Sequence, residues 1–248
     1  MVGRTQIEES RSGAKNTSTT VASSVYDLIR LDILAGNLRP GKKLGSEYLN
    51  RRYNAGLSPV REALNRLATE RLVCLEDQRG FHVAGVSKAG LIDLTKTRCW
   101  LEEIALRQSI ERGDEAWKEQ IVLAFHRLSR TPRSLQEATY AFNAKWEGLH
   151  RDFHNAVIAS CGSHWLLGFC QQLVDQADLY RQRAAAVSYP ERNERSEHQA
   201  LMEVALDRDA DRAVAIQCAH IRKTADIVLE ARLSFLPDEI DPVDPARR

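Results

Sequence analysis

Residues 38–83 constrain the fold of this chain more strongly than any other segment. They begin with a turn, Leu38-Arg39-Pro40-Gly41, and continue into a helix that starts near Ser46. A second turn leads into another helix from Ser58 onward, and a hairpin closes with Gly80-Phe81-His82-Val83. A turn, two helices and a two-stranded wing in this order are the layout of a winged helix-turn-helix.

The second helix of this segment is predicted to bury one face. Ser58 is expected to be its N-cap, with Pro59 at the first helical position, where the missing N–H does no harm. A further helix from about Val21 is predicted to end near Gly36. The apolar residues after Pro59 recur at i, i+3, i+4 and i+7 and form one stripe: Val60, Ala63, Leu64 and Leu67.

The opposite face of the same helix carries candidates for reading DNA. Arg61 and Asn65 stand one helical turn apart, and these residue types pair with guanine and adenine in the major groove. Ser58 and Arg66 complete the candidate face. The alternative is an amphipathic helix with a merely solvated polar face, and the hairpin that follows favours DNA binding.

The hairpin is predicted from two short β-prone runs around a turn that contains glycine. Residues 72–76 form the first run, and the chain returns from Phe81 to Ala84. Arg79 stands at the tip beside Gly80, a place suited to a phosphate or minor-groove contact.

In the order of these residues, the segment resembles the DNA-binding domain of the GntR family of bacterial regulators. Leu38 to Leu44 matches the family's Leu-x-Pro-Gly-x-x-Leu, and Pro59 to Leu64 matches its Pro-Val-Arg-Glu-Ala-Leu. Residues 80–83 match the wing pattern Gly-x-x-Val. Gly56 stands where the family usually has serine and Leu57 where arginine is frequent, so we expect a different helix start and fewer DNA contacts.

Length and charge fit two domains, with DNA binding confined to one end. The chain has 248 residues, enough for two hydrophobic cores, and its net charge is only +1. Residues 1–85 hold 13 Lys+Arg against 9 Asp+Glu, whereas the remainder holds 22 against 25. A mildly basic end on a mildly acidic body is weak support for a DNA contact there.

The other bulk features indicate a cytoplasmic protein without a membrane partner. The five cysteines are odd in number and scattered, which argues against a disulfide framework. No run approaches the roughly 18 apolar residues of a membrane span. Residues 1–20 are expected to be a disordered arm and 236–248 a disordered tail. The winged domain is expected at 21–86 and a second domain at 87–235.

The second domain is predicted to be all helical. Its helical periodicity is interrupted at Gly113, Pro132, Gly162 and Pro190. Six helices result, which predicts an antiparallel bundle and a mostly α protein: 91–112, 115–130, 134–160, 164–185, 191–205 and 210–233.

Four histidines of this domain are candidate metal ligands. His150 and His154 stand at i, i+4, so their rings share one helix face, and His198 and His220 lie on two later helices. Phe153 and Val157 accompany the first pair, which predicts that both imidazoles face the bundle interior. For each histidine taken singly, a scattered surface or core position is the alternative.

The arrangement resembles the FCD ligand-binding domain of the FadR-type branch of the GntR family. That domain has Asp-x-x-Phe-His on one helix and two later histidines, and it binds a divalent metal. Here His150 occupies the place of the aspartate, and Asp152 points about 200° away from it along the helix. An all-nitrogen ligand set favours zinc or nickel, or copper, over manganese.

Two arginines are candidates for binding an effector carboxylate. The resemblance implies such a role for Arg98, because a guanidinium pairs with a carboxylate through two hydrogen bonds. A structural ion pair with Glu102, four residues on, is the equal alternative. Arg181, and after it Arg183, are further candidates.

The sequence therefore predicts a metabolite-responsive, DNA-binding transcription regulator. We expect a repressor that binds a palindromic operator as a homodimer and is released by a small organic acid bound beside a metal. A metal-responsive regulator without an organic effector is one alternative. A metal-dependent enzyme is another, although no general base stands beside the histidines and the winged domain would be left without a role.

Overall fold

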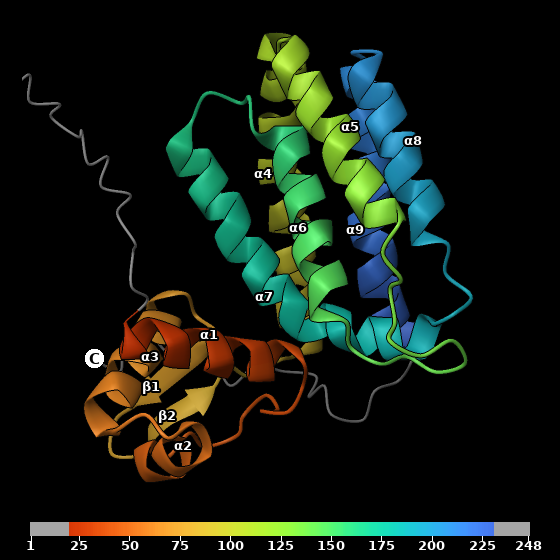
Figure 1. Cartoon of the computed structure of the whole chain (residues 1–248). Coiled ribbons are helices and arrows are strands. Elements are labelled where there is room, and N and C mark those ends of the chain that lie inside the picture. The colour runs from red at the N-terminus through yellow and green to blue at the C-terminus, as the bar shows by residue number, and fades with distance from the viewer. Residues whose placement is uncertain (1–19, 231–248) are drawn as a thin grey trace, which may run out of the picture.

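The computed structural model describes residues 20–230, apart from the side chain of residue 183. Its N-terminal part is a winged helix-turn-helix: α1 (Val21–Leu34), α2 (Ser46–Tyr53), α3 (Leu57–Thr69), β1 (Val73–Glu76) and β2 (Gly80–Val83). A helical bundle follows: α4 (Lys88–Arg112), α5 (Glu115–Ser129), α6 (Ala144–Ile158), α7 (His164–Ser188), α8 (Glu194–Leu206) and α9 (Ala210–Glu230). The predicted mostly helical fold is confirmed (Figure 1).

The expected disordered arm and tail lie outside the described residues, with one exception. Thr20, counted in the arm, is the N-cap of α1, and its hydroxyl accepts a hydrogen bond from the backbone N–H of Ser23. Ordered structure therefore begins inside the expected arm.

The Pro-Gly turn seats a short extended segment against the wing. Gly41 adopts φ +76°, which a residue with a side chain rarely adopts. Its N–H donates to the carbonyl of Val83, and the N–H of Leu44 donates to the carbonyl of Phe81. Leu38 and Leu44, the two ends of the motif, are thereby buried in the core of the domain.

The start of α3 differs from the prediction. Gly56, with φ +78°, is the N-cap, and Ser58 lies inside the first turn. The predicted cap at Ser58 is therefore wrong, because the left-handed backbone at Gly56 turns the chain into the helix two residues earlier. The apolar stripe itself is confirmed, since all four of its members are fully buried: Val60, Ala63, Leu64 and Leu67.

The bundle helices begin where side chains cap them. Ser87, Asp114, Asn143, Ser163 and Asn193 each accept a hydrogen bond from a backbone N–H of the following first turn. The predicted helix over 134–160 is wrong at its start, because α6 begins only at Ala144. Before α6, the hydroxyl of Ser134 accepts hydrogen bonds from the N–H groups of Gln136 and Ala141, which holds residues 134–141 in a loop.

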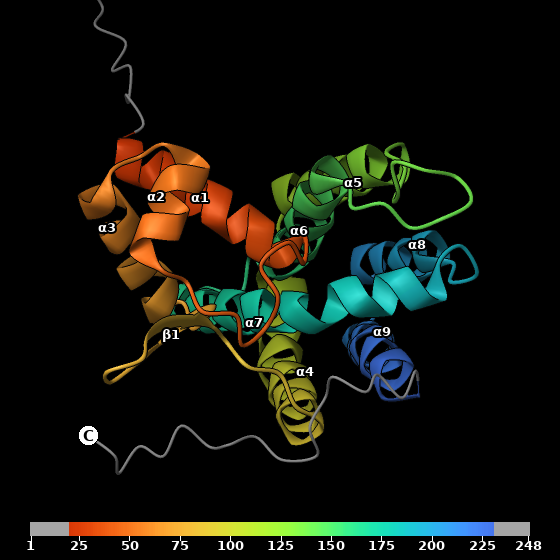
Figure 2. The same cartoon turned by 90° about the horizontal axis from the view of Figure 1, so that it is seen from below.

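The winged domain packs on the bundle through α7. One cluster of buried apolar residues contains most of the winged-domain core together with Leu179, Ala184 and Val228 of the bundle. Seen from below, α7 leads from the winged domain toward α8 (Figure 2). A change in the bundle at α7 can therefore reach α1 directly.

Among residues 20–230, no helix has the length and apolar character needed to cross a lipid bilayer.

Candidate functional site

The four predicted histidines meet in the bundle interior. His150 and His154 come from α6, His198 from α8 and His220 from α9. One ring nitrogen of each lies within 4.8 Å of the others. The Nε2 atom of His154 lies at the centre, 3.2 Å from the Nε2 atoms of both His150 and His198.

This geometry fits a metal ion. Two nitrogens bound at about 2.0–2.1 Å by one tetrahedral ion lie about 3.3 Å apart, close to the two distances at His154. A neutral imidazole has one N–H and one lone pair, so the converging Nε2 atoms cannot all satisfy one another. One cation between them would bind every lone pair, and this would offset the cost of burying these polar groups.

Burial also keeps these imidazoles neutral. It lowers the pKa of His150, His154 and His198 well below the ordinary value, with nearby positive charges acting in the same direction. Burial lowers the pKa of His220 as well, although its hydrogen bond with Glu197 opposes this. Neutral imidazoles are the form that binds a metal.

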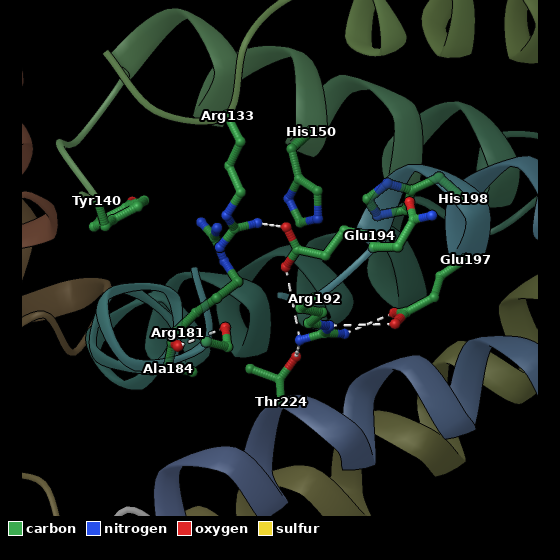
Figure 3. A network of polar contacts seen from close by, with 12 residues as sticks. Arg133, Tyr140, His150, Arg181, Ala184, Arg192, Glu194, Glu197, His198 and Thr224 are labelled. Carbon is green, nitrogen blue, oxygen red and sulfur yellow. Dashed lines mark hydrogen bonds and ion pairs between the residues drawn. The ribbon is translucent and has the colours of Figure 1, made fainter. Parts of the chain in front are cut away.

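A carboxylate that the sequence analysis missed orients His220. The Nδ1 atom of His220 lies 2.7 Å from Glu197, which turns Nε2 toward the cluster. Burial alone would raise the pKa of Glu197, but hydrogen bonds from His220, Arg192 and Lys223 lower it. Arg192, which precedes α8, donates to Glu197 of α8 and to Thr224 of α9, and so ties these two helices together (Figure 3). The position of Glu197 directly before His198 was a usable signal.

Gln217 is a second polar residue beside the histidine cluster that the sequence analysis did not single out. Its amide donates to Glu102 and lies 3.4 Å from Nδ1 of His154. Its buried carbonyl oxygen has no hydrogen-bond partner among the described residues. Asp152, in contrast, is exposed, as the helical phase predicted.

A small cavity of about 40 Å³ adjoins the histidines. Its lining includes His150, His154 and His220 together with Arg98, Arg151 and Arg181. This volume holds about three water molecules. Any organic ligand that enters without a rearrangement must therefore be very small.

The two predicted effector arginines differ in how they are bound. Arg98 donates through Nε and Nη2 to one oxygen of Glu102, so the structural ion pair that the sequence left as the alternative is present. Arg181 is buried and donates to Asp178 and Glu147, but its Nη1 has no partner among the described residues. Burial alone would lower the pKa of Arg181, yet the two carboxylates raise it, so it stays charged. Of the two, Arg181 offers the unused donor.

The candidate DNA-binding face lies on the solvent side of α3. Arg61 and Asn65 are exposed there and line a shallow hollow together with Ser58 and Arg66. Arg66 is less available, because its guanidinium lies 4.1 Å from the Tyr26 ring and donates to Ser23 of α1. At the wing, the side chain of Arg79 is 78% exposed, in a turn that ends at Gly80 with φ +83°.

Comparison with known proteins gives two family matches that divide the chain as the fold does. Residues 21–83 match the family described as bacterial regulatory proteins, gntR family, and residues 93–223 match the FCD domain. Over 210 residues the chain is 39% identical to the uncharacterized HTH-type transcriptional regulator BphR of Paraburkholderia xenovorans, covering 84% of this chain and 85% of that protein. It is 32% identical over 210 residues to the HTH-type transcriptional repressor GlaR of Escherichia coli, covering 83% and 94%.

Solved structures show the same fold. E. coli McbR/YncC superposes with a TM-score of 0.70 at 17% identity, over 86% of this chain and 99% of that one. A putative transcriptional regulator GntR from Rhodococcus sp. RHA1 gives 0.67 at 18% identity, over 85% and 98%. The FCD match spans more than half of the chain, the gntR match covers the winged domain, and BphR is 39% identical over 84% of the chain. The chain therefore belongs to the gntR family of bacterial regulatory proteins, and it is a DNA-binding transcription regulator with an FCD domain, not an enzyme.

Proposed function

We propose that this regulator is a repressor whose bundle holds a divalent metal and, beside it, a small carboxylate that releases the winged domain from DNA. The observation that carries the proposal is the cluster of four imidazoles, three of which line a cavity whose wall also includes Arg181, a guanidinium with one donor left without a partner among the described residues. A cation and a guanidinium facing one small space select an anion.

The metal would be held by His150, His154, His198 and His220. Four nitrogen ligands without a carboxylate favour zinc or nickel over manganese. The bound ion would supply positive charge next to the cavity. A five- or six-coordinate ion has a position left for a carboxylate oxygen, whereas a tetrahedral zinc with four histidines has none, so nickel suits a shared site better.

The carboxylate would be anchored mainly by Arg181, with Arg98 in a secondary place. Arg181 has a buried N–H without a partner among the described residues, and filling it recovers the cost of an unsatisfied donor. Arg98 lines the same cavity, but two of its N–H groups already donate hydrogen bonds to Glu102. The size of the cavity favours the smallest mono- and dicarboxylates over sugars.

The DNA partner would be a palindromic operator read by a homodimer in the cytoplasm. One α3 reads one half-site, so two copies related by a two-fold axis read two half-sites one helical turn apart or a multiple of it. The name of the relative GlaR describes a repressor, which supports repression as the mode of action.

Thermal unfolding of the purified protein tests the ligand proposal. Zinc or nickel alone, and then formate, acetate, lactate or malonate added to the metal-loaded protein, should each raise the unfolding midpoint, because a ligand that binds only the folded state stabilises it. Arg181→Gln should lose the carboxylate response, and Arg98→Ala should keep most of it. A full response in Arg181→Gln would contradict the anchor.

A regulator that responds to metal alone is the second candidate. The small volume of the cavity favours it, because the space accommodates about three waters. Operator binding that depends on zinc or nickel but ignores every carboxylate would decide for it.

Replacing Arg61 by alanine should weaken specific DNA binding. If Arg61 makes a bidentate contact to a guanine, the loss is about 1–3 kcal/mol, or roughly 5- to 150-fold in affinity. Stability should hardly change, because Arg61 is exposed and lies off the buried stripe. The measurement is a gel-shift titration on an operator selected from random duplexes with the protein itself.

The matched control for this measurement is Arg127→Ala. It removes the same charge from an exposed position of α5, far along the chain from the winged domain. Equal affinities of the two variants for the selected operator would remove Arg61 from the DNA-binding face.

A further inference from the structure

A chain of ion pairs runs from the cavity wall to the DNA-binding domain. At the cavity, Arg181 binds Glu147 and Asp178. Asp178 also binds Arg151 of α6, and Arg151 binds Asp175 one turn earlier on α7. At the far end, Asp175 accepts from Arg30 of α1 at 2.6 Å. The alternating order is Glu147, Arg181, Asp178, Arg151, Asp175, Arg30.

The chain is sheltered from solvent and balanced in charge. Its three arginines face three carboxylates, and the side chains are between 4% and 21% exposed. Partly buried pairs are screened far less than surface pairs, so each charge senses its neighbours strongly. Burial alone would raise the pKa of Asp178, but Arg181 and Arg151 lower it, so this link stays ionised.

Its links compete with one another. One oxygen of Asp175 accepts from both Arg30 and Arg151, and also from Gln171. Arg151 binds Asp175 through Nη1 and Asp178 through Nη2, so a shift of its guanidinium toward Asp178 would weaken its bond to Asp175 and leave Asp175 to Arg30. Links along such a chain therefore strengthen and weaken alternately.

We propose that this chain of ion pairs couples the cavity to α1, with Arg151 and Asp175 as positioning residues. This inference rests on the proposed function at one point, namely that the cavity binds an anion. An anion at Arg181 weakens Arg181–Asp178, strengthens Asp178–Arg151, weakens Arg151–Asp175 and strengthens Asp175–Arg30. A bound carboxylate therefore fixes α1, and with it the winged domain, against α7.

Other contacts lie around the last link. Gln176 of α7 donates to the backbone carbonyl of Glu70, and the Glu70 carboxylate accepts from Tyr26 of α1. The strengthened Arg30–Asp175 pair thus acts on a seam where α1 already meets α7, and the orientation of α3 follows because α3 packs on α1.

Hydrogen exchange of the α1 amides in the full-length protein, without any added ligand, tests the coupling. Glu147→Gln keeps the shape of the side chain but removes a negative charge at the cavity end, the reverse of adding an anion. Exchange in α1 should then become roughly two- to fivefold faster. Arg181→Gln removes the positive charge that an anion would neutralise. Exchange in α1 should then become slower relative to exchange in α8, which carries the general loss of stability.

Opposite signs distinguish coupling from simple destabilisation, which would speed exchange in both variants. In an Asp175→Asn background, Glu147→Gln should have no effect on α1. Glu103→Gln, an exposed carboxylate of α4 paired with Arg107, is the matched control and should leave α1 unchanged. Exchange in α8, which holds no member of the chain, reports global stability.

Unchanged α1 exchange in Glu147→Gln would overturn the proposal. So would a change in α1 exchange of the same size when Glu147→Gln is made in the Asp175→Asn background. If Arg181→Gln does not fold, the Glu147 pair of measurements decides alone. No metal or carboxylate enters this experiment, so its failure leaves the ligand proposal standing, and failure of the ligand tests leaves the measured coupling intact.

Discussion

Replacing His154 by alanine should leave the protein unable to bind zinc or nickel. Its Nε2 atom touches both His150 and His198, so its loss removes the centre of the cluster. Wild-type protein purified without chelator should carry about one divalent ion per chain. At a free metal concentration about 1,000 times Kd, the metal should stabilise the wild type by about 4 kcal/mol, and His154→Ala should lose this gain.

Elemental analysis and thermal unfolding with and without metal measure both effects. His164→Ala is the matched control, because His164 is exposed at the start of α7 and belongs to no described histidine cluster. Equal metal content in the two variants would refute the assignment of the site.

Arg181→Ala should destabilise the fold by about 3–5 kcal/mol, because the buried Asp178 and the partly buried Glu147 lose a buried partner. Arg107→Ala, which breaks exposed pairs with Glu103 and Asp211, should hardly change stability. Chemical denaturation of the two variants gives the comparison. A small loss in Arg181→Ala would mean that the carboxylates find water or other cations.

The same variant should show a defined dependence on pH. Burial alone would raise the pKa of Asp178 in the wild type, but Arg181 and Arg151 lower this pKa below its unfolded value. A carboxyl group with a depressed pKa stabilises the fold above its unfolded pKa, and this contribution disappears as pH falls through the folded pKa. The stability difference between the wild type and Arg181→Ala should therefore shrink below about pH 4.

Much of the fold was predictable because its signals are local. Pro40-Gly41, the stripe from Val60 to Leu67 and the run through Gly80 each fix the backbone within a few residues of themselves. The start of α6 was not predictable, because apolar periodicity cannot show that the Ser134 hydroxyl accepts hydrogen bonds from backbone N–H groups of a loop. The cap at Gly56 was missed because Ser58 is the stronger capping residue by type.

By itself, the sequence determined the two-domain plan and the helical phase that places Arg61 and Asn65 on the solvent side of α3. It also singled out the four histidines as one candidate set, since motif order and helical phase depend only on neighbours in the chain. Only the tertiary structure decided which arginine has a donor to offer. Arg98 and Glu102 meet within one helix, whereas the partners of Arg181 come partly from α6. The link from the cavity to Arg30 likewise joins residues 145 positions apart, because the packing of α1 on α7 places charges together that no local pattern relates.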